Sequence, residues 1–206
     1  MVTLLEAEQR CPEMGNLNMA IPKLKSWIFV RSLTNYPLSK MLLKTSRLTA
    51  RMVVESDLQD LYKLHSNPEV MHFIRPPEKS IIETKETLQK ILSYQQENPG
   101  LGNFAAFSAD EGQFIGWHML KHLADTNQVE LGYRLLPEFW GKGYATEMGR
   151  ALIEYAKNNL NLKELVAITH PENFASQHVL GKLGFDYQRE DRFYGIDVKF
   201  YQMNLV

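Results

Sequence analysis

The sequence predicts an α/β fold, because segments with a strand pattern alternate with segments with a helix pattern along most of the chain. From residue 47 onward the predicted order is strand, two helices, three strands, helix, strand, helix and two strands. Between residues 129 and 149 a strand, a glycine-rich turn and a helix follow one another directly. A turn at Asp110-Glu-Gly112 joins two of the strands as a hairpin.

The composition is that of an ordinary globular protein. The chain has 206 residues, of which 44% are hydrophobic, and a formal net charge of −1 at pH 7. So small a charge gives no general attraction to nucleic acid or to an anionic membrane. Cys11 is the single cysteine, which excludes an intrachain disulfide and a thiolate metal site. The longest apolar run near the start, residues 27–30, is too short to span a membrane, so we expect a cytoplasmic protein.

Residues 1–44 show little sustained periodicity, and Pro12, Pro22 and Pro37 would interrupt a helix. We predict an N-terminal extension of uncertain structure over this range and a single domain over residues 45–206. The extension could dock on that domain or on a second subunit, so a homodimer is one possibility.

The first third of the domain predicts one strand and two helices. Residues 47–54 carry the strand pattern. Ser56 is a plausible N-cap of the first helix, whose apolar side chains share one face. Residues 67–77 contain three prolines and predict a loop. Ser80 is the expected N-cap of the second helix, which ends before the Asn98-Pro-Gly100 turn.

Two hairpin strands and a third strand follow. The hairpin covers residues 103–109 and 113–123. Residues 129–135 alternate in polarity, which predicts a strand buried on one side, with Glu130 on the opposite side. Pro137 cannot continue a hydrogen-bond ladder, so the strand ends there.

The rest of the chain predicts two helices and three strands. From Tyr144 onward apolar residues recur at helical spacing. A strand at 165–169 precedes the last helix, which ends at Gly184, a usual residue after a helix. Residues 185–189 and 199–205 are the closing strands.

The turn before the long helix has the properties of an anion-binding site. Gly141 and Gly143 flank Lys142 there. Glycine permits positive φ and removes the Cβ that would hold an anion away from the backbone. Free N–H groups and the positive end of the helix dipole favour a phosphate or pyrophosphate. The spacing matches neither the P-loop nor the dinucleotide fingerprint, and an ordinary tight turn would also explain the glycines.

Several motifs, in this order and spacing, resemble the GNAT superfamily of acetyl-CoA-dependent N-acetyltransferases, especially its RimJ/RimL branch of ribosomal-protein N-terminal acetyltransferases. The matching segments are 45–51, 66–71, 130–133, 140–147, the pair Asn173 and Ser176, and 179–185. The resemblance covers about residues 45–205. It implies a mostly antiparallel central sheet of about seven strands, split like a V between the fourth and fifth strands, with helices on both faces.

The resemblance also implies that acetyl-CoA binds with its pyrophosphate on the glycine-rich turn. The candidate cofactor-binding residues are Leu135, Leu136, Trp140, Gly141, Lys142, Gly143, Tyr144, Ala145, Thr146, Asn173 and Ser176. An N–H near Leu135 or Leu136 is the implied oxyanion donor. Trp140 stands where the wider superfamily carries Gln or Arg, which removes one polar partner. Lys142 could add charge for a phosphate or simply remain solvated.

Acetyl transfer to an amine requires a route for the amine proton and a group that protonates the leaving thiolate. Glu130 is our candidate for the proton route, although a strand glutamate in a salt bridge is the simpler interpretation. Ser176 and Tyr133 are the candidates for the second role, with Tyr144 as an alternative. Asn173 could equally be only an N-cap, and Ser176 only a first-turn hydroxyl.

By analogy, the first two helices and their loop line the acceptor side, where His72, Phe73 and Arg75 are the candidate substrate-binding residues. A surface histidine is the commoner interpretation of His72. No metal site is expected, because His118 and His122 lack a third ligand at metal spacing.

The expected activity is direct transfer of acetyl from acetyl-CoA to a primary amine in a ternary complex. The acceptor would be a protein N-terminus, such as that of a ribosomal protein, or a small-molecule amine. The alternative is a non-catalytic acyl-CoA-binding sensor or interaction module.

Overall fold

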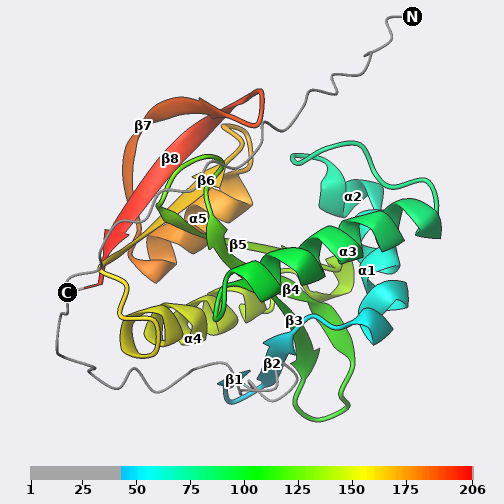
Figure 1. Ribbon diagram of the computed structural model, residues 1–206. Helices are drawn as coiled ribbons and strands as arrows, with labels where there is room; N and C mark the ends of the chain where they lie inside the picture. The colour runs from blue at the N-terminus through cyan, green and yellow to red at the C-terminus, as the bar shows by residue number, and fades with distance from the viewer. Residues whose placement is uncertain (1–42, 206) are drawn as a thin grey trace, which may run out of the picture. The chain divides into compact units, whose positions relative to one another are not determined.

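The computed structural model describes residues 43–205, and these residues form an eight-stranded sheet in the order β1-β2-β3-β4-β5-β6-β8-β7 (Figure 1). The strands are β1 (Leu43–Lys44), β2 (Leu48–Met52), β3 (Gly102–Ser108), β4 (Phe114–His122), β5 (Val129–Leu135), β6 (Glu164–Thr169), β7 (Asp186–Phe193) and β8 (Ile196–Asn204). All neighbouring strands are antiparallel except β5 and β6, which are parallel. The predicted mostly antiparallel sheet is confirmed, with the short β1 as an additional strand.

Helices cover both faces of the sheet, as predicted. They are α1 (Leu58–His65), α2 (Pro68–Met71), α3 (Ile81–Glu97), α4 (Tyr144–Asn158) and α5 (Phe174–Leu183), with 3-10 turns at Glu55–Asp57 and Pro137–Phe139. α1 and α3 pack on β4 and β3 from one face, and α4 packs on β4 and β5 from the other.

The sheet is split between β5 and β6, the fourth and fifth of the predicted strands. These two strands pair at a single register position, Glu130 opposite Val166, near the start of β5. Beyond it, the rest of β5 has no ladder on that side, whereas its pairing with β4 runs from Val129 to Leu135. The predicted V-shaped split is therefore confirmed.

A contact between α4 and α5 links the two halves of the split sheet. α4 packs on β4 and β5, α5 packs on β6, and the two helices pack against each other. At Gly149 of α4, an added Cβ would lie 2.8 Å from Cδ1 of Leu183 in α5. The helices approach this closely because residue 149 has no side chain.

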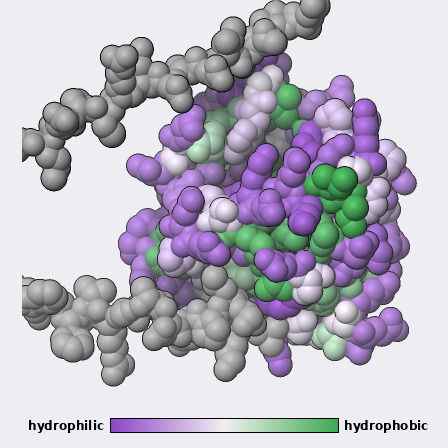
Figure 2. All heavy atoms as spheres, turned by 45° about the vertical axis from the view of Figure 1, so that its right-hand side comes forward, coloured by the Kyte–Doolittle hydropathy of each residue, from purple (hydrophilic) through white to green (hydrophobic). Residues whose placement is uncertain are grey.

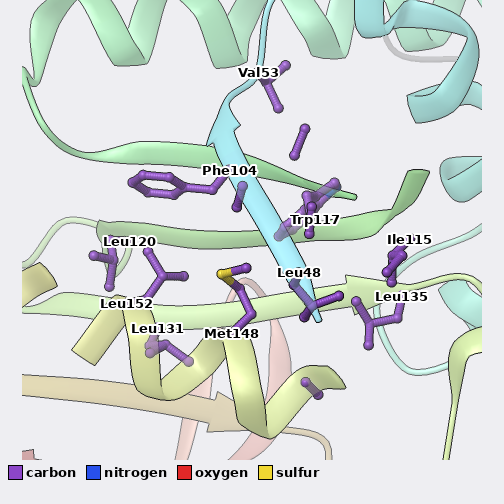
Figure 3. Packing of buried hydrophobic residues seen from close by; sticks show 14 of the residues in the cluster. Leu48, Val53, Phe104, Ile115, Trp117, Leu120, Leu131, Leu135, Met148 and Leu152 are labelled. Carbon is purple, nitrogen blue, oxygen red and sulfur yellow. The ribbon is translucent and has the colours of Figure 1, made fainter. Parts of the chain in front are cut away.

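The core between the sheet and α4 contains the largest apolar residues of the helix. Met148 and Leu152 are both fully buried, and Figure 3 shows them reaching the strands beside Leu120 and Leu131. Burial of one such side chain stabilises a fold by about 1.5–3 kcal/mol. The predicted amphipathic character of this helix is confirmed.

Several local predictions can be compared with the structure. Ser80 accepts a hydrogen bond from Glu83 N at 3.4 Å and is the N-cap of α3, as predicted. The prediction of Ser56 as an N-cap is wrong, because a 3-10 turn precedes α1 and the carboxylate of Asp57 accepts from Val54 N at 2.9 Å. Residues 67–77 are not entirely a loop, since Asn67 caps the short α2.

The two ends of the domain also differ from expectation. The last two strands are longer than predicted and meet at Tyr194-Gly195. The predicted extension over residues 1–44 lies outside the described residues, except for Leu43 and Lys44, which pair with β2 as β1.

We predict that Leu152→Ala lowers the free energy of unfolding by about 2–5 kcal/mol, because it removes buried methyl groups and leaves a cavity. Urea denaturation followed by circular dichroism measures the change. The control is Lys157→Ala on the exposed side of α4, which should change stability by no more than about 0.5 kcal/mol. Equal effects of both variants would contradict the described packing of α4.

Candidate active site

The turn between β5 and α4 adopts a conformation that requires glycine. Gly141 has φ 71° and Gly143, the N-cap of α4, has φ 80°. Residues other than glycine rarely adopt this left-handed backbone conformation without strain. Residues 141–143 are exposed, so the turn faces solvent.

The backbone N–H groups of this turn are available to a ligand. Trp140 N donates to Pro137 O and Glu147 N donates to Gly143 O, both at 3.0 Å. Between them, the N–H groups of residues 141–146 have no acceptor among residues 43–205. They lie at the positive end of the helix dipole, which favours an anion.

Residues 45–47 hold this turn through Glu147, a clamp that the sequence reasoning missed. Glu147 Oε1 accepts from Thr45 Oγ1 at 2.6 Å and from Ser46 Oγ and Arg47 N at 3.0 Å. The Arg47 guanidinium donates to Glu147 Oε2 through Nε at 2.7 Å and to Lys142 O at 3.0 Å. Arg47 also lies 4.6 Å above the ring of Tyr144.

The clamp changes the acidity of Glu147. Burial alone would raise its pKa, but hydrogen bonds from Thr45, Arg47 and Ser46 outweigh burial and lower the pKa to about 2. The carboxylate is therefore ionised throughout the neutral range and ties the chain before β2 to the first turn of α4.

A groove of about 780 Å³ opens beside the turn. Three cationic side chains, Arg47, Arg150 and Lys182, line it together with two carboxylates, Glu147 and Glu154. Arg47 already pairs with Glu147, which leaves Arg150 and, from α5, Lys182 as the cations of the groove outside the clamp.

Trp140 and Lys142 do not direct their polar atoms at the turn. The half-exposed Trp140 donates from Nε1 to Leu135 O at 2.8 Å, which ties the turn to the end of β5. Lys142 Nζ lies 5.4 Å from the ring centroid of Phe139.

The backbone at the end of β5 distinguishes the two candidate oxyanion donors. Leu136 N donates to Ile115 O at 2.9 Å and is therefore already paired. Successive N–H groups of a strand point alternately to its two neighbours. The N–H groups of Tyr133 and Leu135 consequently point toward the split, and Leu135 remains the better candidate.

Glu130 is 5% exposed, which corrects the prediction that β5 is buried on one side only. Glu130 shares its face of the sheet with its cross-strand neighbour Lys121, whose Nζ lies 4.4 Å from the ring centroid of Tyr94 in α3. Burial raises the pKa of Glu130 to about 7, although Lys121 and Arg134 partly offset this effect. No ion pair among residues 43–205 includes Glu130. A carboxyl that is about half ionised at neutral pH is suited to proton transfer.

The structure brings Tyr133 of β5 and Ser176 of α5 together. Burial raises the pKa of Tyr133, and an interaction with the Ser176 hydroxyl partly offsets it. Asn173 is the N-cap of α5 and accepts from Ser176 N at 3.0 Å. The N-cap interpretation of Asn173 is therefore confirmed, and its contact with a cofactor remains a prediction.

His118 supports Tyr133 and the turn from within the core. It is fully buried, and its ring stacks on Tyr133 with centroids 5.6 Å apart. Burial lowers the pKa of His118 to about 4, so the ring is neutral near pH 7. Its Nε2 lies 3.3 Å from Ala145 O in the first turn of α4. The sequence reasoning considered this histidine only as a metal ligand.

The candidate acceptor residues lie directly after α2. His72 is exposed, and its ring meets that of Phe73 edge to face at 4.5 Å. Phe73 stacks on His170, which follows β6, at 5.1 Å. The acceptor loop therefore reaches the far side of the split.

A buried polar network anchors this loop to the sheet. Glu78 accepts hydrogen bonds from Arg75, Thr84 and Thr87. Burial would raise the pKa of Glu78, but these bonds lower it to about 2. The Nδ1 atom of His65 lies 3.4 Å from Oε1 of Glu78. Its Nε2 atom accepts a hydrogen bond from Trp117 Nε1 at 3.2 Å.

Two further properties concern the described part of the chain. Among residues 43–205, no three His, Cys, Asp or Glu side chains are grouped so that they could hold a metal ion. None of the helices in this part combines the length and apolar character needed to cross a membrane.

Comparison with known proteins identifies the family. A family model described as an acetyltransferase (GNAT) domain matches residues 47–186. An FsC-acetyl coenzyme A-N(2)-transacetylase from Aspergillus fumigatus is 31% identical over 70% of this chain and 65% of its own length. The uncharacterized N-acetyltransferase p20 of Bacillus licheniformis is 30% identical over 69% of this chain and 81% of its own length. The chain thus spans less than two thirds of the Aspergillus protein.

Solved structures share the fold. Spermidine N-acetyltransferase from Vibrio cholerae, in complex with CoA and spermine, has a TM-score of 0.66 at 23% identity, covering 78% of this chain and 97% of that one. The ribosomal L7/L12 α-N-protein acetyltransferase RimL, in complex with coenzyme A, has a TM-score of 0.69 at 19% identity, covering 80% and 98%. These two structural neighbours are named for different acceptors. Membership of the RimJ/RimL branch therefore stays a prediction for this chain.

We predict that Glu147→Gln destabilises the protein at pH 7 by about 1–3 kcal/mol, because the charged hydrogen bonds of the clamp are lost. The folded pKa of Glu147 is depressed to about 2, so this stabilisation is complete above the ordinary pKa and is lost as pH falls from about 4 toward 2. Urea denaturation at pH 7, 4 and 3 measures the difference. The control is Glu154→Gln, an exposed residue of the same helix. A difference independent of pH would contradict the clamp.

Proposed function

Since this chain belongs to the GNAT family of acetyltransferases, we propose that it transfers the acetyl group of acetyl-CoA directly to a primary amine, with Glu130 accepting the amine proton. The observation that carries the proposal is the arrangement along β5. A buried carboxyl with a pKa of about 7 lies at the start of this strand, and an anion-binding turn follows its end.

The residues of the turn fit coenzyme A. Its pyrophosphate matches the run of free N–H groups in residues 141–146, and a further phosphate matches the groove cations outside the clamp, Arg150 and Lys182. The unpaired side of β5 gives the extended arm of the cofactor a backbone to bind. The N-terminal part of α5, with Asn173 and Ser176, lies on the other half of the split.

Each site residue has a defined part in the transfer. Acetyl-CoA supplies the activated thioester, whose C–S bond breaks as the new C–N bond forms. In this proposal Leu135 N stabilises the negative charge that develops on the carbonyl oxygen. Glu130 is five residues earlier in β5, about 16 Å along the strand, so it takes the proton of the amine nitrogen through water. Tyr133, in contact with Ser176, returns a proton to the sulfur.

The acceptor in this proposal is the amine of a protein N-terminus or of a small molecule, bound beside the α2 loop with His72, Phe73 and Arg75. The supporting observation is that Phe73 and His170 bridge the two sides of the split. Direct transfer in a ternary complex agrees with the single cysteine, Cys11, which stands outside the family-like region of the sequence.

We predict that Glu130→Gln lowers kcat/KM by about 10²–10⁴-fold, because the isosteric amide cannot accept a proton. In the unmodified protein, kcat/KM should rise with pH through about 7 as the Glu130 carboxyl ionises. The release of thiol from acetyl-CoA, measured with a panel of primary amines, gives both the effect of the substitution and the pH dependence of kcat/KM. The control is Glu138→Gln, an exposed residue. Undiminished transfer by Glu130→Gln would show that another group removes the proton.

We predict that acetyl-CoA at 100 times its dissociation constant adds about 2.7 kcal/mol to stability, whereas NAD adds nothing. For a chain of this size the melting temperature should rise by roughly 5–10 °C. Gly143→Ala should reduce this rise relative to its own ligand-free melting temperature, because alanine is strained at φ 80°. No rise at millimolar acetyl-CoA would mean that the turn is not a cofactor site.

A further inference from the structure

Arg134 lies on the face of β5 that the acceptor loop covers. It is directly opposite Trp117 of β4, and its guanidinium carbon lies 4.8 Å from the centroid of that ring. Its Nη1 lies 3.6 Å from Sδ of Met71 at the end of α2. The side chain is half-buried, so a cation is partly withdrawn from water between the sheet and the loop.

Glu78 and Glu130 act on this cation only through space and raise its pKa, but no carboxylate of residues 43–205 forms an ion pair with it. None of the ion pairs formed within residues 43–205 includes Arg134. Glu78, the acid of the nearby loop, already pairs with Arg75 and accepts from Thr84 and Thr87. A thioether and an aromatic face are weak substitutes for an anion.

The other acid on this face, Glu130, is four residues earlier, about 13 Å along the strand. Lys121 stands opposite Glu130 and brings a further positive charge. Arg75 and Glu78 neutralise each other as an ion pair. The remaining charged groups are two cations, Lys121 and Arg134, and the incompletely ionised carboxyl of Glu130. The site is positively charged on balance.

Arg134 retains its charge at neutral pH. Burial and the charge of Arg75 lower its pKa to about 10, which still leaves the guanidinium protonated at pH 7. A partly desolvated charge without a counter-ion is unfavourable. The planar guanidinium is also the group best suited to bind a carboxylate or phosphate through two parallel hydrogen bonds.

We propose that the acceptor is an amine that also carries a carboxylate, and that this carboxylate pairs with Arg134 while the amine faces the thioester and loses its proton toward Glu130. The inference rests on the proposed acetyl transfer and specifies its substrate class. A polyamine is disfavoured in the same site, because its additional ammonium groups would meet Arg134 and Lys121. Arg134 is thus a residue that determines acceptor specificity.

Matched acceptors test the proposal with the full chain and acetyl-CoA. One set compares ω-amino acids of increasing length with n-alkylamines of the same length. A second compares the peptides Ala-Glu-Ala and Ala-Gln-Ala, both amidated at the C-terminus, and spermidine serves as the polycation. We expect the best carboxylate-bearing acceptor to exceed its neutral counterpart and spermidine by about tenfold or more in kcat/KM.

Variants connect this preference to the residue. Arg134→Gln should raise the KM of the carboxylate-bearing acceptor and bring the ratio of kcat/KM between the matched acceptors near one. Arg134→Lys should retain part of the preference. The acetyl-CoA-induced rise in melting temperature should persist in both variants, which shows that they are folded and bind the cofactor. The control is Arg192→Gln, an exposed residue of β7.

Three outcomes would overturn the inference. They are equal or faster transfer to the neutral amines or spermidine, a preference that survives Arg134→Gln, and no transfer to any acceptor of the panel by protein that binds acetyl-CoA. Transfer to spermidine would leave the proposed acetyl transfer intact and reject only the acceptor class. Absence of acetyl-CoA binding would instead reject the proposed function itself.

Discussion

The arrangement of the site depends on one interrupted ladder. An interior strand normally pairs its backbone on both sides, and buried polar groups that remain unpaired are costly. β5 pairs with β4 along its full length but with β6 only at Glu130 opposite Val166. The remaining N–H groups on that side point into the split. Trp140 satisfies the carbonyl of Leu135, and the other groups form no ladder with β6.

Two distant segments keep the split aligned with the anion-binding turn. Thr45, Ser46 and Arg47 hold Glu147 in the first helical turn, while His118 reaches the same turn from β4 through Ala145 O. These contacts hold the first turn of α4 in the absence of a ligand. Preorganised N–H groups bind an anion without the cost of reordering a loop.

The sequence predicted the features that depend on local pattern. The strand, turn and helix of residues 129–149 follow from two periodicities and two glycines, and the N-cap of Ser80 follows from its own neighbours. It did not predict the clamp on Glu147, whose donors are about a hundred residues away, or the burial of Glu130, which depends on neighbours outside its own strand. Ser56 was misplaced because Asp57, the next residue, offers a competing carboxylate that forms the turn.

The packing of α4 on α5 is one of the contacts that join the two half-sheets. The closest approach of those helices is at Gly149, where a single methyl group would collide with Leu183. Residue 149 lies within the helix pair, where a larger side chain would have to push α4 away from Leu183 of α5. A substitution there would act as a spacer, so the width of the split can change without any substitution among the residues proposed to perform the chemistry.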